Sequence, residues 1–170
     1  MKTNITLIGM PSAGKSMIGV RLAKELGLQF LDVDLLIQQI EGKLLKEILD
    51  EKGVDGFAEI EERINCSVNP EKTVIAPGGS VIYGKKAMEH LRSISHVVYL
   101  KISYEEAAER LGDLHERGVA LRDGMTLKDL YEERIPLYEQ YADLIVDEEG
   151  LSMGQIVDTI RDKMLQILYK

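Results

Sequence analysis

A glycine-rich turn between an apolar run and a helical pattern constrains the fold more than any other stretch. It reads Gly9-Met-Pro-Ser-Ala-Gly14-Lys15-Ser16 and matches G-x-x-x-x-G-K-[ST] at every fixed position. In this motif, backbone N–H groups and the start of the following helix point at a polyphosphate, and the glycines permit the tight curvature. An apolar run precedes the turn and helical periodicity follows it, so the context predicts a nucleoside triphosphate site rather than a glycine turn without a ligand.

The motif also predicts what individual side chains do. The Lys15 ammonium can reach the β- and γ-phosphates, and the Ser16 hydroxyl can ligate Mg²⁺. The expected nucleotide-binding residues of this turn are Gly9, Pro11, Ser12, Ala13, Gly14, Lys15, Ser16 and Met17.

Short apolar runs alternate with helical patterns along the whole chain. Strands are expected at 4–9, 29–34, 73–78, 96–101 and 143–147, and helices at 15–26, 44–52, 57–66, 104–111, 127–141 and 152–168. The expected strands are apolar on successive positions, which is typical of strands covered on both faces. The pattern therefore predicts one α/β domain over 1–170, with a mostly parallel sheet wrapped by helices.

Composition excludes several classes of protein. The 170 residues suit a single domain, and the net charge of −8 argues against a general nucleic-acid surface. No run approaches the roughly 18 apolar residues of a membrane span. Cys66 is the only cysteine, so no internal disulfide forms, and the first residues lack the pattern of a signal peptide. We expect a cytoplasmic protein with neither nucleic acid nor membrane as a partner.

Acidic residues and glycines follow two of the expected strands. Asp32 and Asp34 close the second strand, where i and i+2 side chains point the same way, so both carboxylates can face the site. One can hold Mg²⁺ and the other can accept a hydroxyl proton, although ordinary strand-end or cap acids are the alternative. Gly78 and Gly79 end the third strand and allow a ligand close to the backbone, or form a simple turn.

Taken together, the motif set resembles the shikimate kinases. The glycine-rich turn, "DVD", "VIAPGGS", "VVYLKIS" and "ERIPLYEQYADLIVD" occur in that family's order and spacing, from about Ile5 to the C-terminus. The resemblance implies the three-layer α/β/α P-loop fold of the nucleoside-monophosphate kinases, with sheet order 2-3-1-4-5 and a mobile lid at about 112–126. It also implies transfer of the γ-phosphate of ATP to the 3-hydroxyl of shikimate on the route to aromatic amino acids, by a protein that is expected to be a monomer.

The resemblance assigns roles residue by residue. Asp32 and Ser16 match the Mg²⁺ site, and Asp34 matches the acid that grips the substrate hydroxyls and serves as base. Arg117 matches the lid arginine over the phosphates, and Arg110 matches a residue beside the adenine. The catalytic set is then Lys15, Asp34 and Arg117, and the substrate-binding set is Asp34, Gly78, Gly79, Ser80 and Arg134, with Arg134 on the substrate carboxylate.

Three departures from the family pattern concern the acceptor pocket or its lid. Ala58 stands where the family has an arginine that binds the substrate carboxylate, Ser80 replaces a third glycine, and Gly118-Val119 follows Arg117 in place of Pro-Leu. A divergent shikimate kinase could replace the lost contact with Arg134 and with Arg63 or Arg122, and Arg122 could also be the working lid arginine. The alternatives are a kinase of another small hydroxylated metabolite and a nucleotide-binding protein without catalysis.

Overall fold

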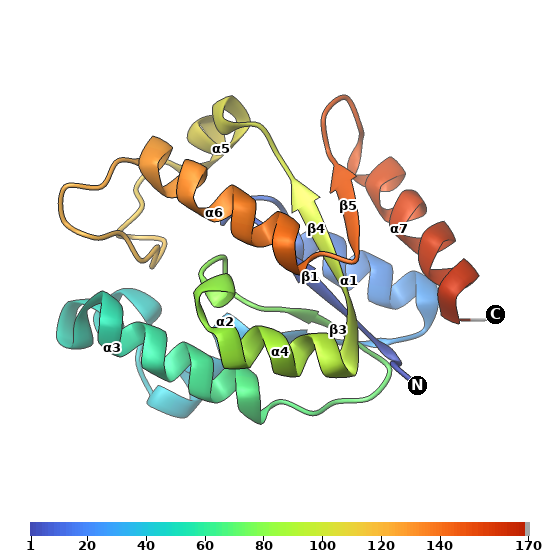
Figure 1. Ribbon diagram of the computed structural model, residues 1–170, viewed down its shortest axis with the longest axis horizontal. Helices are drawn as coiled ribbons and strands as arrows, with labels where there is room; N and C mark the ends of the chain where they lie inside the picture. Colours follow the sequence, from blue (N-terminus) through green and yellow to red (C-terminus); the bar gives the residue numbers. More distant parts are fainter. Residues whose placement is uncertain (169–170) are drawn as a thin grey trace.

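The computed structural model describes residues 1–168 and forms a five-stranded sheet covered by helices on both faces (Figure 1). The strands are β1 (Asn4–Ile8), β2 (Gln29–Asp32), β3 (Thr73–Ala76), β4 (Ser95–Lys101) and β5 (Leu144–Asp147). The helices are α1 (Lys15–Leu26), α2 (Val33–Glu41), α3 (Leu45–Ser67), α4 (Lys85–Ile94), α5 (Tyr104–Leu111), α6 (Leu127–Tyr141) and α7 (Met153–Leu168), with a 3₁₀ turn η1 (Val81–Tyr83).

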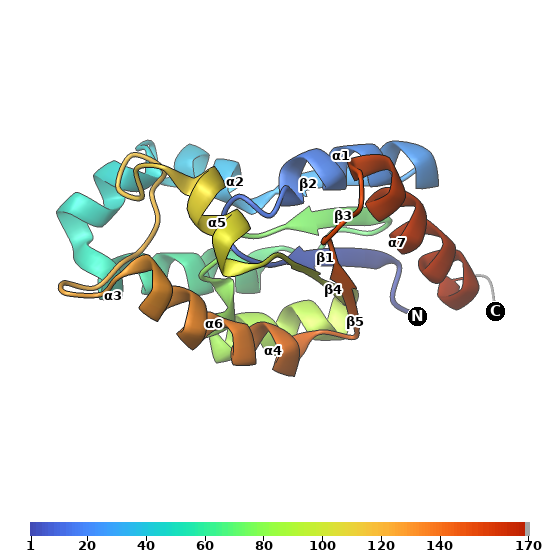
Figure 2. The ribbon, with the colours of Figure 1, turned by 90° about the horizontal axis from the view of Figure 1, so that it is seen from above.

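Every strand pairing in the sheet is parallel, in the order β2-β3-β1-β4-β5. The expected order 2-3-1-4-5 is therefore confirmed. Seen from above, α1 and α7 cover one face of the sheet, and α4 and α6 cover the other (Figure 2). The carboxyl ends of β1 and β3 are neighbours in this order, so the loops that follow these two strands meet at one edge of the sheet, where open α/β sheets bind ligands.

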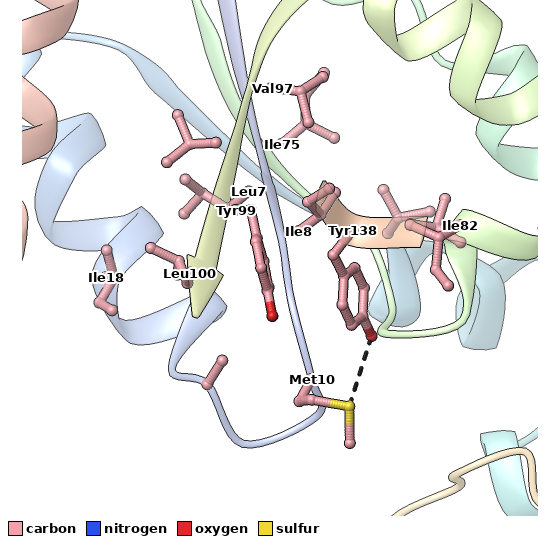
Figure 3. Packing of buried hydrophobic residues seen from close by; sticks show 14 of the residues in the cluster. Leu7, Ile8, Met10, Ile18, Ile75, Ile82, Val97, Tyr99, Leu100 and Tyr138 are labelled. Carbon is pink, nitrogen blue, oxygen red and sulfur yellow. Dashed lines mark hydrogen bonds between the residues drawn. The ribbon is translucent and has the colours of Figure 1, made fainter. Parts of the chain in front are cut away.

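The burial of the strands follows their place in the sheet. All five residues of β1 and all four of β3 are buried, as the continuous apolar runs predicted. The edge strands β2 and β5 keep partly exposed residues, so coverage on both faces holds for the centre of the sheet and not for its edges. Where β1 ends, Tyr99 and Tyr138 stack with ring centroids 5.1 Å apart, next to Met10 (Figure 3).

Most of the predicted elements are present, and the differences have local causes. The helices at 15–26, 104–111 and 127–141 have the predicted bounds, and Gly27 ends α1 in the left-handed conformation. The two helices expected at 44–52 and 57–66 run together as α3, with a break at Gly53, whose φ of 70° is not helical. Helices α2 and α4 were not predicted. The start of α2 was taken as strand, because α2 follows β2 without an intervening loop.

None of the helices within residues 1–168 is both long enough and apolar enough to cross a membrane.

Candidate active site

The turn after β1 is shaped to bind an anion. Gly9 and Gly14 have φ values of 152° and 88°, and a Cβ on Gly9 would lie 2.7 Å from the Leu100 carbonyl oxygen. Ser12 also has a positive φ, of 82°, and this strain at a functional turn is typical of a binding loop. Gly14 begins α1 without a side-chain cap, so the first N–H groups of the helix stay available to a ligand.

Lys15 lies inside this loop. Its ammonium group donates to the carbonyl oxygens of Gly9 and Met10 at 2.8 and 2.9 Å, so it is aimed across the turn. The side chain is buried, and this burial lowers the pKa of the ammonium group to about 8, while Asp34 opposes the shift. A partly dehydrated cation at this position interacts strongly with any anion that enters the loop.

Ser16 and Asp32 form a pair of oxygen donors at the mouth of the loop. The Ser16 hydroxyl donates to Asp32 Oδ2 at 3.0 Å. Within residues 1–168, His, Cys, Asp and Glu side chains form no group of three or more that could hold a metal by themselves. Two oxygens beside a phosphate loop nevertheless suit Mg²⁺, which takes few protein ligands and completes its shell with phosphate and water.

Asp32 and Asp34 do not both lie on a strand, contrary to the prediction, although both side chains line the cavity. β2 ends at Asp32, which caps α2 by accepting from the Leu35 N–H, and Asp34 lies in the first turn of that helix. A helical turn, rather than strand alternation, brings Asp34 to the cavity wall. Burial raises the pKa of Asp34 to about 6, with Lys15 opposing the shift.

The turn after β3 gathers charged groups around two glycines. A Cβ on Gly78 would lie 2.6 Å from Asp34 Oδ1 and 3.0 Å from Glu61 Oε2. One on Gly79 would lie 3.0 Å from Arg134 Nη1. A Cβ at either position would therefore displace these side chains, and two carboxylates and one guanidinium lie close to the backbone of this turn.

Arg134 is the most deeply buried cation of the site. It is 1% exposed, and among the described residues its Nε and Nη1 have no hydrogen-bond partner. The Tyr83 ring lies 5.4 Å from the guanidinium carbon, and Nη2 donates to the Ala120 carbonyl at 3.4 Å. A buried guanidinium with two free donor groups is a receptor for an oxyanion, because leaving these donors unsatisfied is costly.

Glu61 is the site residue that the sequence reasoning left unassigned. It is 3% exposed, and its two carboxylate oxygens lie 2.7 and 2.9 Å from the Ser80 hydroxyl, which donates its one proton to the carboxylate. Burial raises the pKa of Glu61 to about 7. The available signal was the i, i+4 spacing of Phe57 and Glu61, which puts both on the face of α3 that lines the cavity. Ser80 turns toward Glu61, so its hydroxyl occupies the room that a third glycine would leave.

The loop over 112–126 borders the same cavity. The candidate arginines differ in which space their side chains line. Arg117 lines the cavity together with the phosphate loop, whereas Arg122 lines an adjoining hollow and pairs with Asp55. Arg63 pairs with Glu41 and lines neither space, so it is not a replacement for the lost contact. Gly118, with a φ of 67°, packs so tightly against α3 that a Cβ would lie 2.6 Å from Leu45 Cβ, which explains the glycine.

Most of the predicted residues therefore line one cavity of about 350 Å³. Its wall holds the following predicted residues: Pro11, Ser12, Gly14, Lys15, Ser16, Met17, Asp32, Asp34, Gly78, Gly79, Ser80, Arg117 and Arg134. Gly9 and Ala13 belong to the same turn but are not among the residues that line the cavity. Arg110 donates to the Ser12 carbonyl at 3.1 Å and lines a neighbouring hollow with Glu148, so it borders the loop from outside the main cavity.

Comparison with known proteins agrees with this geometry. Residues 11–165 match the family described as shikimate kinase. The chain belongs to the shikimate kinase family. A shikimate kinase of Persephonella marina is 34% identical over 158 residues, which cover 92% of this chain and 96% of that protein.

Two solved structures of the family superpose closely on the fold. The shikimate kinase of Aquifex aeolicus is 31% identical, with a TM-score of 0.82 and 95% of each chain covered. The shikimate kinase of Acinetobacter baumannii, solved in complex with shikimate, is 27% identical, with a TM-score of 0.79 and coverage of 99% of this chain and 94% of that one. Of the three departures from the family pattern, Ala58 and Ser80 line the hollow beside Arg122 and Gly118 lies in the loop over 112–126, so none of them falls in the phosphate loop.

Proposed function

We propose that this chain is an ATP-dependent shikimate kinase, which transfers the γ-phosphate of ATP to the 3-hydroxyl of shikimate within one domain that works as a monomer. The observation that carries the proposal is the presence of two anion receptors in one cavity. The phosphate loop with Lys15 lines this cavity together with the buried Arg134, which has two donor groups without a partner among the described residues. Asp34 lines the same cavity. This arrangement fits a polyphosphate donor and an acceptor that carries a carboxylate.

On the donor side, backbone N–H groups of the loop, from Ser12 and from Gly14 to Ser16, would hold the phosphates of ATP, with Lys15 turning from two carbonyl groups to the β- and γ-phosphates. The adenine would lie near Arg110, in the hollow beside the loop. Ser16 and Asp32 are the residues that would hold Mg²⁺. Bound there, the ion would neutralise charge on the phosphate oxygens.

On the acceptor side, Arg134 would bind the carboxylate of shikimate, and the turn at Gly78-Gly79 would allow the ring to lie against the backbone. Asp34 would accept the proton of the attacking hydroxyl. One bond forms between that oxygen and the γ-phosphorus, the bond from the γ-phosphorus to the bridging oxygen breaks, and ADP departs. With a pKa of about 6, Asp34 is ionised at neutral pH and is matched to this task.

Arg117 would complete the site from the loop over 112–126. Its side chain is exposed at the cavity rim, where it can reach charge that develops on the transferred group. Closure of this loop would exclude water and thereby prevent hydrolysis of ATP in place of transfer.

The direct test is ADP release by the purified protein with ATP, Mg²⁺ and shikimate, beside a panel of other hydroxylated acids, amino acids and sugars. We expect saturable turnover that depends on shikimate. Lys15→Ala should lower kcat by orders of magnitude while circular dichroism shows an unchanged fold. Turnover only with another panel compound, or ATP binding without any stimulated turnover, would contradict the proposed function.

A further inference from the structure

A second hollow, of about 390 Å³, adjoins the acceptor side of the site. It shares wall residues with the main cavity, namely Phe57, Glu61, Ser80 and Ala120. Ala58 forms part of its wall, so the hollow lies where a longer side chain at position 58 would extend. The two spaces are therefore neighbouring compartments with a common wall.

The charges around this hollow do not balance. Two glutamates, Glu61 and Glu133, line the hollow. Among the described residues, Arg122 is the only lysine or arginine that lines it. Glu133 accepts a hydrogen bond from the Tyr83 hydroxyl at 2.6 Å, and among the described residues the Glu61 carboxylate accepts only from Ser80. Among the described residues, no cation lies within ion-pair distance of the buried Glu61 carboxylate. Such a group calls for a positive partner or for a proton.

Arg122 is held where it is by a weak contact. Its Nη2 lies 2.9 Å from Asp55 Oδ1, and the two side chains are 63% and 83% exposed. Exposed pairs of this kind contribute little, so leaving Asp55 costs little. Two residues earlier, the Ala120 carbonyl already accepts from Arg134 Nη2. The backbone that carries Arg122 is thus in contact with the residue that we expect to bind the acceptor carboxylate.

We propose that Arg122 is a second substrate-binding residue, which leaves Asp55, enters the hollow beside Ala58 and holds the acceptor carboxylate together with Arg134. This inference rests on the proposed function, because it assumes an acceptor with a carboxylate. The guanidinium group would lie between Glu61 and the acceptor, so it would give the buried Glu61 a counter-ion at the same time. Arg134 is part of α6, whereas Arg122 is part of the loop over 112–126, which would close over the site.

The test compares two arginines that differ in position and not in exposure. Arg122 and Arg63 are each 63% exposed and each paired with one carboxylate, but Arg63 lines neither the main cavity nor the second hollow. We expect Arg122→Ala to raise the KM for shikimate about tenfold or more, as for the loss of a charged hydrogen bond, with kcat and the KM for ATP within about twofold. Arg63→Ala should leave all three constants unchanged.

An analogue with a neutral carboxamide in place of the carboxylate identifies the contact. Wild-type protein should bind it more weakly than shikimate, and Arg122→Ala should not weaken its binding further. A shikimate KM within twofold of wild type in Arg122→Ala would overturn the inference, as would an equal rise for shikimate and the carboxamide. If instead the wild-type protein shows no turnover with shikimate, the proposed function itself fails, and the two failures are distinguished by the wild-type assay.

Discussion

Removing the charge of Glu61 should make the free energy of unfolding less dependent on pH. Burial raises the pKa of this carboxyl group from the ordinary value of 4.5 to about 7. The Ser80 hydroxyl, Arg134 and Lys15 oppose the shift, and Asp34 adds to it. The 3% exposure of the side chain means that solvent screens these effects little.

The sign and size follow from proton linkage. Between pH 4.5 and about 7, the folded protein holds a proton on Glu61 that the unfolded chain has lost, so the free energy of unfolding falls as the pH rises. A shift from 4.5 to about 7 corresponds to about 3 kcal/mol when fully developed. The stabilising contribution of the neutral form is therefore present below pH 4.5 and lost above pH 7.

Glu61→Gln keeps the shape and stays neutral at every pH. The free energy of unfolding is measured for both proteins by urea denaturation without ligand. The value for Glu61→Gln minus the value for wild type should be about 3 kcal/mol larger at pH 8 than at pH 4.5. Glu59→Gln, at an exposed position on the same helix, is the matched control and should show no such change. A difference between Glu61→Gln and wild type that is constant from pH 4.5 to pH 8 would refute the reasoning.

Two further substitutions test the cavity. Asp34→Asn should lower kcat by about two to four powers of ten with little change in ATP affinity measured by calorimetry, and an equal loss of ATP affinity would contradict the division of roles. In wild type, kcat/KM should rise with pH through about 6 as Asp34 loses its proton, and a flat profile there would exclude it as the base. Gly79→Ala puts a Cβ 2.8 Å from Pro11 Cδ and 3.0 Å from Arg134 Nη1, so the KM for shikimate should rise about tenfold. Gly154→Ala, with ordinary contacts, is the control, and equal kinetic effects of the two substitutions would count against the close-approach argument.

The phosphate loop is the part of the site that could be predicted from sequence. Its function depends on backbone conformation over a few consecutive residues, and glycine, lysine and serine at fixed spacing encode that conformation locally. The strands at the centre of the sheet could also be predicted, because burial on both faces leaves apolar residues at most successive positions. The family resemblance added the sheet order, which composition and periodicity do not determine.

Local patterns failed where contacts between distant segments decide the outcome. Asp34 reaches the cavity through a helix that begins without a loop, and the sequence around it reads equally well as strand. The sequence shows Glu61 only as a glutamate on a helix. Its burial and its hydrogen bond from Ser80 arise because α3 packs beside the turn at Ser80. The choice among Arg117, Arg122 and Arg63 likewise depends on which element each side chain faces.

By itself, the amino-acid sequence determined the α/β alternation, the phosphate loop and the set of charged residues available for catalysis, because short-range spacing and burial patterns encode all three. Only the tertiary structure decided which of these charges are buried together, and hence which titrate abnormally and which face the acceptor. The reason is physical: desolvation and Coulomb interactions depend on distances between residues far apart in the chain, and those distances exist only once the sheet and its helices have packed.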